Sequence, residues 1–255
     1  MDIDNIREQI ENDLEWRLDE IAFFTAQLNH LRPLNTSDKE KQRVEKDKNR
    51  FRKALVLILY AHFEGLVRYA LRLYAEALNE ENINLSEAID VLVASSLHRE
   101  FGQYDDSKER IKSESSEFNK ANKRLNNRVN LIQELNQLWQ ENKVKLPISD
   151  RHNDKGSVLY TESNLNFDTI EKILYRLGFP TDILDLEISG RKFKDILNEF
   201  LGRRNAIAHG DKLKKGIDEK QYNEFKNVFD KITIIIPIAI TKALNKKLYL
   251  KKQFR

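Results

Sequence analysis

Residues Leu55–Leu71 read LVLILYAHFEGLVRYAL, and this stretch decides the fold class. Apolar side chains recur in it every three or four residues, and the same spacing continues on both sides. The apolar positions are Phe51, Leu55, Leu59, Phe63, Leu66, Ala70, Leu73 and Ala77. Because residues spaced in this way share one face of an α-helix, the pattern predicts a single long helix from about Ser37 to Leu78.

The same periodicity predicts helices along most of the chain. The expected ranges are 3–31, 87–101, 125–139, 166–178, 189–210 and 218–248. Pro33 would end the first of these helices, because proline cannot continue a helical hydrogen-bond ladder. Asn166 is expected to cap one helix, while Gly178 and Gly210 each end one in the left-handed conformation. The sequence therefore predicts an all-α protein.

The last of these helices contains the β-branched run KITIIIPIAIT, which also has a strand propensity. Its apolar side chains nevertheless fall on helical spacing, at Ile232, Ile235, Ile236, Ala239, Ile240, Ala243 and Leu244. This regular spacing outweighs the local preference of the isoleucines, so we predict a helix that contains Pro237.

The middle third of the chain is less regular. We interpret residues 79–165 as an insertion in one domain that spans residues 1–255, with the motif helix and the last helix within 189–248. Trp16 and Trp139 lie on apolar helical faces, so we expect them in a core or an interface.

Composition excludes several classes of protein. The 255 residues include 8 Gly and 4 Pro, which favours long helices with few chain reversals. The absence of cysteine excludes disulfides, thiolate nucleophiles and cysteine zinc sites, and is typical of a reducing cytosol. The N-terminus has no signal-peptide pattern, and the longest apolar run, ITIIIPIAI, is too short to span a bilayer. We therefore expect a soluble cytoplasmic protein with no membrane partner.

The stretch Phe200–Lys214, FLGRRNAIAHGDKLK, places polar side chains within an apolar helical pattern. Arg204 continues the apolar face, and Asn205 and His209 are one helical turn apart on a shared face. Gly210 can turn the chain away and leave the His209 imidazole at an open helix end. This pattern fits a structural ion pair at a helix end or a site that handles anions.

The string RNAIAHG resembles the signature of the HEPN superfamily, an all-helical domain with an Arg-x(4–6)-His motif. The stretch Leu55–Leu71 and the segment NFDTIEKILYRLGF are similar to the MAE-type HEPN subgroup. The resemblance is concentrated in residues 37–80 and 163–247. It implies a HEPN-type helical bundle with long N-terminal helices and an inserted middle segment.

Many HEPN proteins are metal-independent endoribonucleases, so the resemblance implies RNA cleavage by attack of the 2′-hydroxyl on the adjacent phosphate. His209 suits proton transfer, and Arg204 offers fixed positive charge to a phosphorane. Asn205 would orient His209 or donate a hydrogen bond to the phosphate, and Glu64 would neutralise Arg204 or tune His209. No cofactor or metal is expected. HEPN domains typically dimerise with both motifs facing one cleft, so a homodimer is expected here as well.

The chain carries positive charge in three clusters. One of them, with Arg203, Lys212, Lys214 and Lys215, surrounds the motif and is expected to bind RNA. The others lie in Lys39–Lys53, where a mixed-charge helix surface is an equal alternative, and in Lys242–Arg255.

Other interpretations stay open at this point. Arg204 and His209 could be structural, and Glu64 could form an ion pair with Arg68. The family also includes non-catalytic modules that bind RNA, nucleotide or a partner protein, and toxins that act in defence and are held by an antitoxin or another partner protein. Where a nucleotidyltransferase silences the toxin, a tyrosine commonly lies two positions after the histidine, and this chain has Asp211 there.

Overall fold

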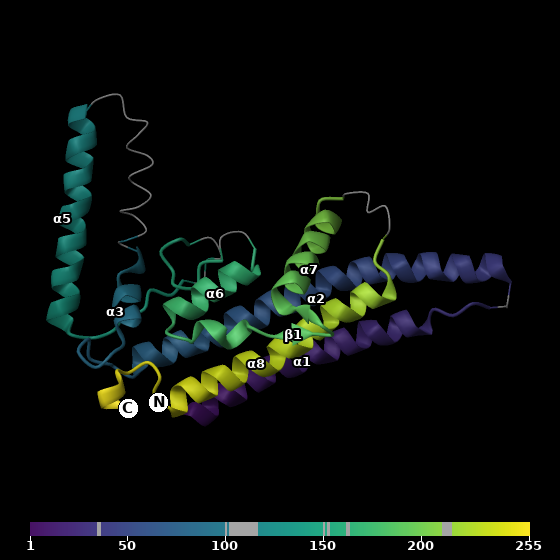
Figure 1. Ribbon diagram of the computed structural model, residues 1–255, viewed down its shortest axis with the longest axis horizontal. Helices are drawn as coiled ribbons and strands as arrows, with labels where there is room; N and C mark the ends of the chain where they lie inside the picture. Colours follow the sequence, from purple (N-terminus) through teal and green to yellow (C-terminus); the bar gives the residue numbers. More distant parts are fainter. Residues whose placement is uncertain are drawn as a thin grey trace. The chain divides into compact units, whose positions relative to one another are not determined.

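The computed structural model describes residues 1–34, 37–99, 101, 117–149, 151, 154–161, 164–210 and 216–255. Within these residues the chain is all-α, with a single two-stranded hairpin, which confirms the predicted fold class (Figure 1). The α-helices are α1 Ile3–His30, α2 Asp38–Glu80, α3 Asp90–Ser96, α5 Glu117–Glu141, α6 Phe167–Arg176, α7 Phe193–Ala208 and α8 Glu219–Asn245. Two 3₁₀ turns, η1 Thr181–Leu184 and η2 Lys252–Phe254, and the strands β1 Glu187–Ile188 and β2 Arg191–Lys192 complete the elements.

Each predicted helix overlaps one of these helices, but several bounds differ. In place of the helix predicted over 87–101, α3 spans Asp90–Ser96, and the helix predicted to begin at Leu125 begins at Glu117. The helix that carries the motif begins at Phe193 rather than near Ser189, because a short hairpin precedes it. Ser189 and Gly190 form the turn of this hairpin, and both have positive φ angles, of 52° and 76°. Such a turn cannot continue into a helix, and sequence periodicity alone gave no sign of it.

The chain divides into two compact units. Unit 1 contains residues 1–3, 71–181 and 240–255, and unit 2 contains residues 4–70 and 182–239. The helices α2 and α8 each contribute residues to both units. The predicted insertion, residues 79–165, falls within unit 1, and the Arg204–His209 motif falls within unit 2.

Unit 2 is built from α1, the first part of α2, α7 and most of α8. Its centre is an aromatic cluster in which α2 meets α7 and α7 meets α8. Tyr60 packs edge-on against Phe200 at 5.5 Å between ring centroids, and Phe200 stacks on Phe225 at 4.9 Å. Phe63 adds a further contact to Phe200, and all four side chains are buried. This packing fixes the position of α7 on α2 within the unit.

Unit 1 surrounds the end of α2 with shorter elements. The helix α3 packs against α6, where the Ser95 hydroxyl donates a hydrogen bond to the Arg176 carbonyl at 2.8 Å. Asn166 caps α6 by accepting a hydrogen bond from the Thr169 amide at 2.8 Å, as predicted. Gly178, with φ +80°, follows the end of this helix, also as predicted.

The helix α2 is long and apolar enough to cross a membrane by length and composition, and it is the one such helix among the described residues. More than half of its most apolar window is nevertheless buried by the rest of the chain. This burial is what a central core helix shows.

Neither tryptophan lies in the core of the described parts of the chain. Trp16 on α1 is 49% exposed and Trp139 on α5 is 65% exposed. Helical periodicity identifies a side of a helix but not whether another element of the same chain covers that side, so the core alternative is wrong and the interface alternative stays a prediction.

Candidate functional site

The motif lies at the C-terminal end of α7, after the part of the helix that forms the core. The buried face of α7 consists of Phe193, Ile196, Leu197 and Phe200. Arg204 is the next residue along this face, one turn after Phe200. The aromatic cluster that anchors Phe200 therefore also determines where the Arg204 side chain begins.

The Arg204 guanidinium lies over the ring of Tyr60, with 4.8 Å from its Cζ atom to the ring centroid. Its Nη1 donates a hydrogen bond of 2.8 Å to the Oδ1 of Asn205. The Arg204 side chain is half-buried, whereas Tyr60 is almost completely buried. A cation over an aromatic ring face is stabilised electrostatically, so this arrangement holds the charge in place while solvent still reaches it.

His209 lies just beyond the last turn of α7 and is exposed. Its backbone amide donates to the Asn205 carbonyl at 2.9 Å, and the Gly210 amide donates to the Ile207 carbonyl at 3.1 Å. Gly210 has a φ angle of +74°, the left-handed conformation that turns the chain away from the helix axis. The imidazole is thus at an open helix end, as the sequence indicated.

Arg204 and His209 differ in their direction around the helix. Five residues at about 100° each place them roughly 140° apart around the axis. Arg204 accordingly faces α2, whereas His209 projects from the end of α7. A single α7 therefore presents the two groups on different sides.

Glu64 lies one helical turn after Tyr60 on α2, and it is close enough to Arg204 to be affected by its charge. Burial raises the pKa of the Glu64 carboxyl, while the positive charges of Arg68 and Arg204 act in the opposite direction. The effect of burial on this pKa is larger than that of the two arginines, so the pKa is raised overall. Glu64 is thus an electrostatic neighbour of the motif.

The basic residues predicted to bind RNA are only partly described. Arg203 is half-buried on α7, whereas Lys212, Lys214 and Lys215, together with Asp211, lie outside the described residues. Ile217, just after this segment, donates its backbone amide to the Asn49 Oδ1 at 3.3 Å. A Cβ atom on Gly216 would collide with Asn49, so α2 packs closely against the chain here.

Arg52 on α2 supports the same region and was not singled out by sequence reasoning. Its side chain is almost fully buried and makes ion pairs with Glu45 at 2.8 Å and with Glu219, in the first turn of α8, at 3.9 Å. In the sequence, the one indication that Arg52 could be buried is that it directly follows Phe51, which belongs to the apolar pattern.

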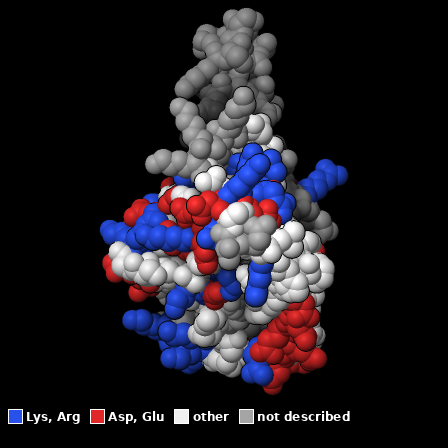
Figure 2. Space-filling view, turned by 90° about the vertical axis from the view of Figure 1, so that its right-hand side faces the viewer, with Lys and Arg blue, Asp and Glu red and all other residues white. Residues whose placement is uncertain are grey.

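The Lys39–Lys53 stretch shows mostly local charge pairing. Arg43 contacts Glu40 at 2.7 Å, and Arg50 contacts Asp47 at 3.1 Å, in both cases within one helical turn. Figure 2 shows basic and acidic side chains interspersed, with acidic side chains gathered at one side. This end of α2 therefore fits a mixed-charge helix surface better than a uniformly positive RNA surface.

A second polar cluster joins α1 to α2 within unit 2, and sequence reasoning missed it. The His62 Nε2 lies 2.9 Å from a Glu20 carboxylate oxygen, and the Trp16 ring packs edge-on against His62 at 5.3 Å. The Arg17 guanidinium pairs with Asp13 at 2.8 Å. Burial is the main cause that lowers the pKa of His62, so its neutral form is favoured. This cluster ties the N-terminal helix to α2.

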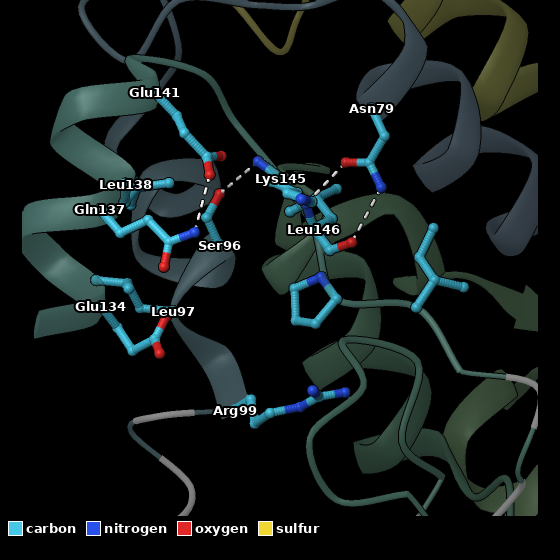
Figure 3. Close-up of a pocket in the computed structure, with 12 residues that line it drawn as sticks. Asn79, Ser96, Leu97, Arg99, Glu134, Gln137, Leu138, Glu141, Lys145 and Leu146 are labelled. Atoms are coloured by element: carbon cyan, nitrogen blue, oxygen red, sulfur yellow. Dashed lines mark hydrogen bonds between the residues drawn. The ribbon is translucent and has the colours of Figure 1, made fainter. Parts of the chain in front are cut away.

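A cavity of about 470 Å³ lies in unit 1, between α5, the end of α3 and the segment around Lys145 (Figure 3). Asn79 uses both ends of its amide on the Leu146 backbone, at 2.7 and 3.0 Å. The Ser96 hydroxyl accepts a hydrogen bond from the Lys145 amide at 3.2 Å. Basic and acidic side chains both line the cavity, so its charge does not select an anion. We interpret the cavity as a packing gap between these segments of unit 1.

No group of three or more His, Asp or Glu side chains that could hold a metal ion occurs among the described residues. The prediction of metal independence is therefore left to an experiment.

The model of one protein family, described as RiboL-PSP-HEPN, matches residues 12–242 of this chain. The chain belongs to the RiboL-PSP-HEPN family. The match covers α2, α7 and most of α8, and it confirms the HEPN resemblance, whereas the similarity to the MAE-type subgroup stays a prediction. Membership suggests a ribonuclease or a nucleotide-binding HEPN module. The searches of curated proteins and of solved structures gave no match.

Proposed function

We propose that this HEPN protein is a metal-independent endoribonuclease that cleaves RNA by 2′-hydroxyl attack and acts as a toxin or defence effector. The observation that carries the proposal is the end of α7, where a held but solvent-reachable Arg204 precedes an exposed His209. Arginine suits a phosphorane because it keeps its charge and offers a planar fork of donors. Histidine suits proton transfer at neutral pH. The role in defence rests on the family resemblance alone.

The working form of the enzyme is proposed to be a homodimer with the two motifs facing one cleft. Cleavage needs a proton acceptor on one side of the phosphorus and a proton donor on the other. One α7 supplies one exposed histidine, and it directs Arg204 to a different side of the helix. A two-fold dimer would bring a second His209 and a second Arg204 to the same phosphate.

The test compares the wild type with Arg204→Ala and His209→Ala on a mixed RNA pool, with and without EDTA. We expect 2′,3′-cyclic phosphate and 5′-hydroxyl ends, no effect of EDTA, and a loss of about a hundredfold or more in each variant. Equal cleavage by all three proteins would refute the site, and loss of cleavage in EDTA would refute metal independence.

The alternative is a HEPN module that binds RNA, nucleotide or a partner protein without cleavage. A purified wild-type dimer that binds RNA tightly but leaves every RNA intact would favour this alternative over the ribonuclease.

A further inference from the structure

We infer that Tyr60 is a positioning residue for the candidate active site, because its ring holds the Arg204 guanidinium in the orientation that receives a phosphate. The inference rests on the proposed function. Tyr60 was not among the residues that sequence reasoning assigned to the site. Its role follows from a contact between two helices that are far apart in the sequence.

The Tyr60 side chain cannot move freely. It is almost completely buried on α2, and its ring contacts Phe63 at 5.9 Å and Phe200 at 5.5 Å between centroids. A ring packed on several sides keeps one rotamer. The face that it turns toward Arg204 is thus a fixed surface.

Two contacts hold the guanidinium. Its Cζ lies over the face of the Tyr60 ring, 4.8 Å from the centroid, and the Asn205 Oδ1 accepts a hydrogen bond from Nη1 at 2.8 Å. The ring and the amide oxygen together restrict where the guanidinium can lie. Without these contacts, the Arg204 side chain would lose conformational freedom about several rotatable bonds when a phosphate binds.

An aromatic ring at this position differs from a carboxylate in its effect on the charge of Arg204. A carboxylate would also hold an arginine, but it would neutralise the charge that a phosphorane needs. Tyr60 orients the cation through the negative face of its ring and adds no formal charge. Glu64, one turn further along α2, is an acid whose charge interacts with that of Arg204. Tyr60 orients Arg204 without adding a negative charge of its own.

The test uses Tyr60→Phe and Tyr60→Leu, with cleavage of a defined RNA as the readout. Phe keeps the ring face, so kcat should stay within about threefold of the wild type. Leu keeps an apolar side chain but removes the ring, so kcat should fall about tenfold or more while KM changes little. In an Arg204→Ala background the Leu substitution should have no further effect, because Tyr60 acts through Arg204.

Tyr74→Leu is the matched control. Tyr74 is equally buried on the same helix, where its ring contacts Phe179 at 4.7 Å in unit 1. It should lower the melting temperature about as much as Tyr60→Leu does, without the loss of kcat. The inference is overturned when Tyr60→Leu keeps wild-type kcat, when Tyr60→Phe loses as much as Tyr60→Leu, or when the effect persists without Arg204.

A measurement on the wild type separates this inference from the proposed function. Side-chain NMR signals of Arg204, assigned with Arg204→Lys, should be shifted upfield by the Tyr60 ring relative to those of Arg203. If the signals are shifted upfield but the protein cuts no RNA, the ribonuclease proposal is refuted while the Tyr60–Arg204 contact is supported. A signal typical of a freely moving arginine would refute the positioning role whether or not RNA is cut.

Discussion

Arg204 occupies a position that the helical repeat of α7 assigns to the buried face. It is half-buried, lies over Tyr60 and donates to Asn205. Asn205 was expected to orient His209 or to bind phosphate, and these roles stay predictions. In the structure its Oδ1 accepts a hydrogen bond from the guanidinium of the preceding residue, a pairing that adjacent positions on a helix would not suggest.

The pKa of Glu64 leads to a prediction about stability. Because the pKa is raised in the folded protein, the folded state holds its proton more tightly than the unfolded state does. The free energy of unfolding of the wild type, relative to Glu64→Gln, should therefore be highest below pH ~4.3 and fall as the pH rises through the folded pKa. Urea unfolding of both proteins across this range measures the difference, with the exposed Glu15→Gln as control. A relative stability that increases with pH would contradict the raised pKa.

Individual side-chain contacts determine how closely two helices can approach each other. The helix α1 lies so close to α2 at Gly65 that a Cβ atom there would be 2.5 Å from the Arg17 Nη1. Arg17 is at the same time held by Asp13. Gly202, on α7, has no atom within 4 Å of the position that a Cβ would take. The two helical glycines thus offer a direct comparison.

Gly202→Ala should stabilise the protein by about 1 kcal/mol, because alanine loses less backbone entropy in a helix than glycine does. Gly65→Ala has the same intrinsic advantage but must displace Arg17 from its ion pair, so its free energy of unfolding should not rise. Thermal or urea unfolding of the two variants gives the values. An equal gain in both would show that Arg17 does not pack against Gly65.

The packing of α3 against α6 predicts a sensitivity to acid. Burial and, to a smaller extent, the charge of Arg176 lower the pKa of His98 to about 4. The unfolded state therefore binds a proton at a higher pH than the folded state, so this contribution is present above pH ~6.5 and is lost as the pH falls toward the folded pKa. His98→Gln should flatten the pH profile of unfolding between these values, and the exposed His30→Gln should not.

In the proposed enzyme, two groups on different sides of α7 must act on one phosphate. Within the described residues, Arg204 faces α2 and His209 projects from the helix end. The proposed two-fold dimer would resolve this difference, because its one cleft would contain motif residues of both chains.

Subunit mixing tests this proposal. Arg204→Ala and His209→Ala are each expected to be inactive, but a mixed dimer keeps one Arg204 and one His209 in the shared cleft. Exchange of subunits between the two variants should thus restore part of the RNA cleavage. Light scattering must show a dimer in each sample. Activity that stays absent in verified mixed dimers, or a wild type that is monomeric while cutting RNA, would contradict a shared site.

The sequence predicts the helices, though not all of their bounds, as well as the HEPN family and the exposed end of α7. Helical periodicity, the Asn166 cap and the Gly178 and Gly210 turns act over a few residues, so they can be recognised in the chain without knowing what packs where. Arg204 and His209 are five residues apart, so their spacing can also be recognised in the chain without knowledge of the packing.

The contacts between side chains of different helices could not be predicted from the sequence, and the folded chain is needed to see them. Tyr60 lies 144 positions before Arg204, and nothing in the spacing of either residue indicates that one ring covers the other cation. The same holds for Gly65 with Arg17, and for Asn49 with Ile217. These contacts depend on how helix surfaces interlock, which is set by the shapes of many side chains together rather than by any one segment.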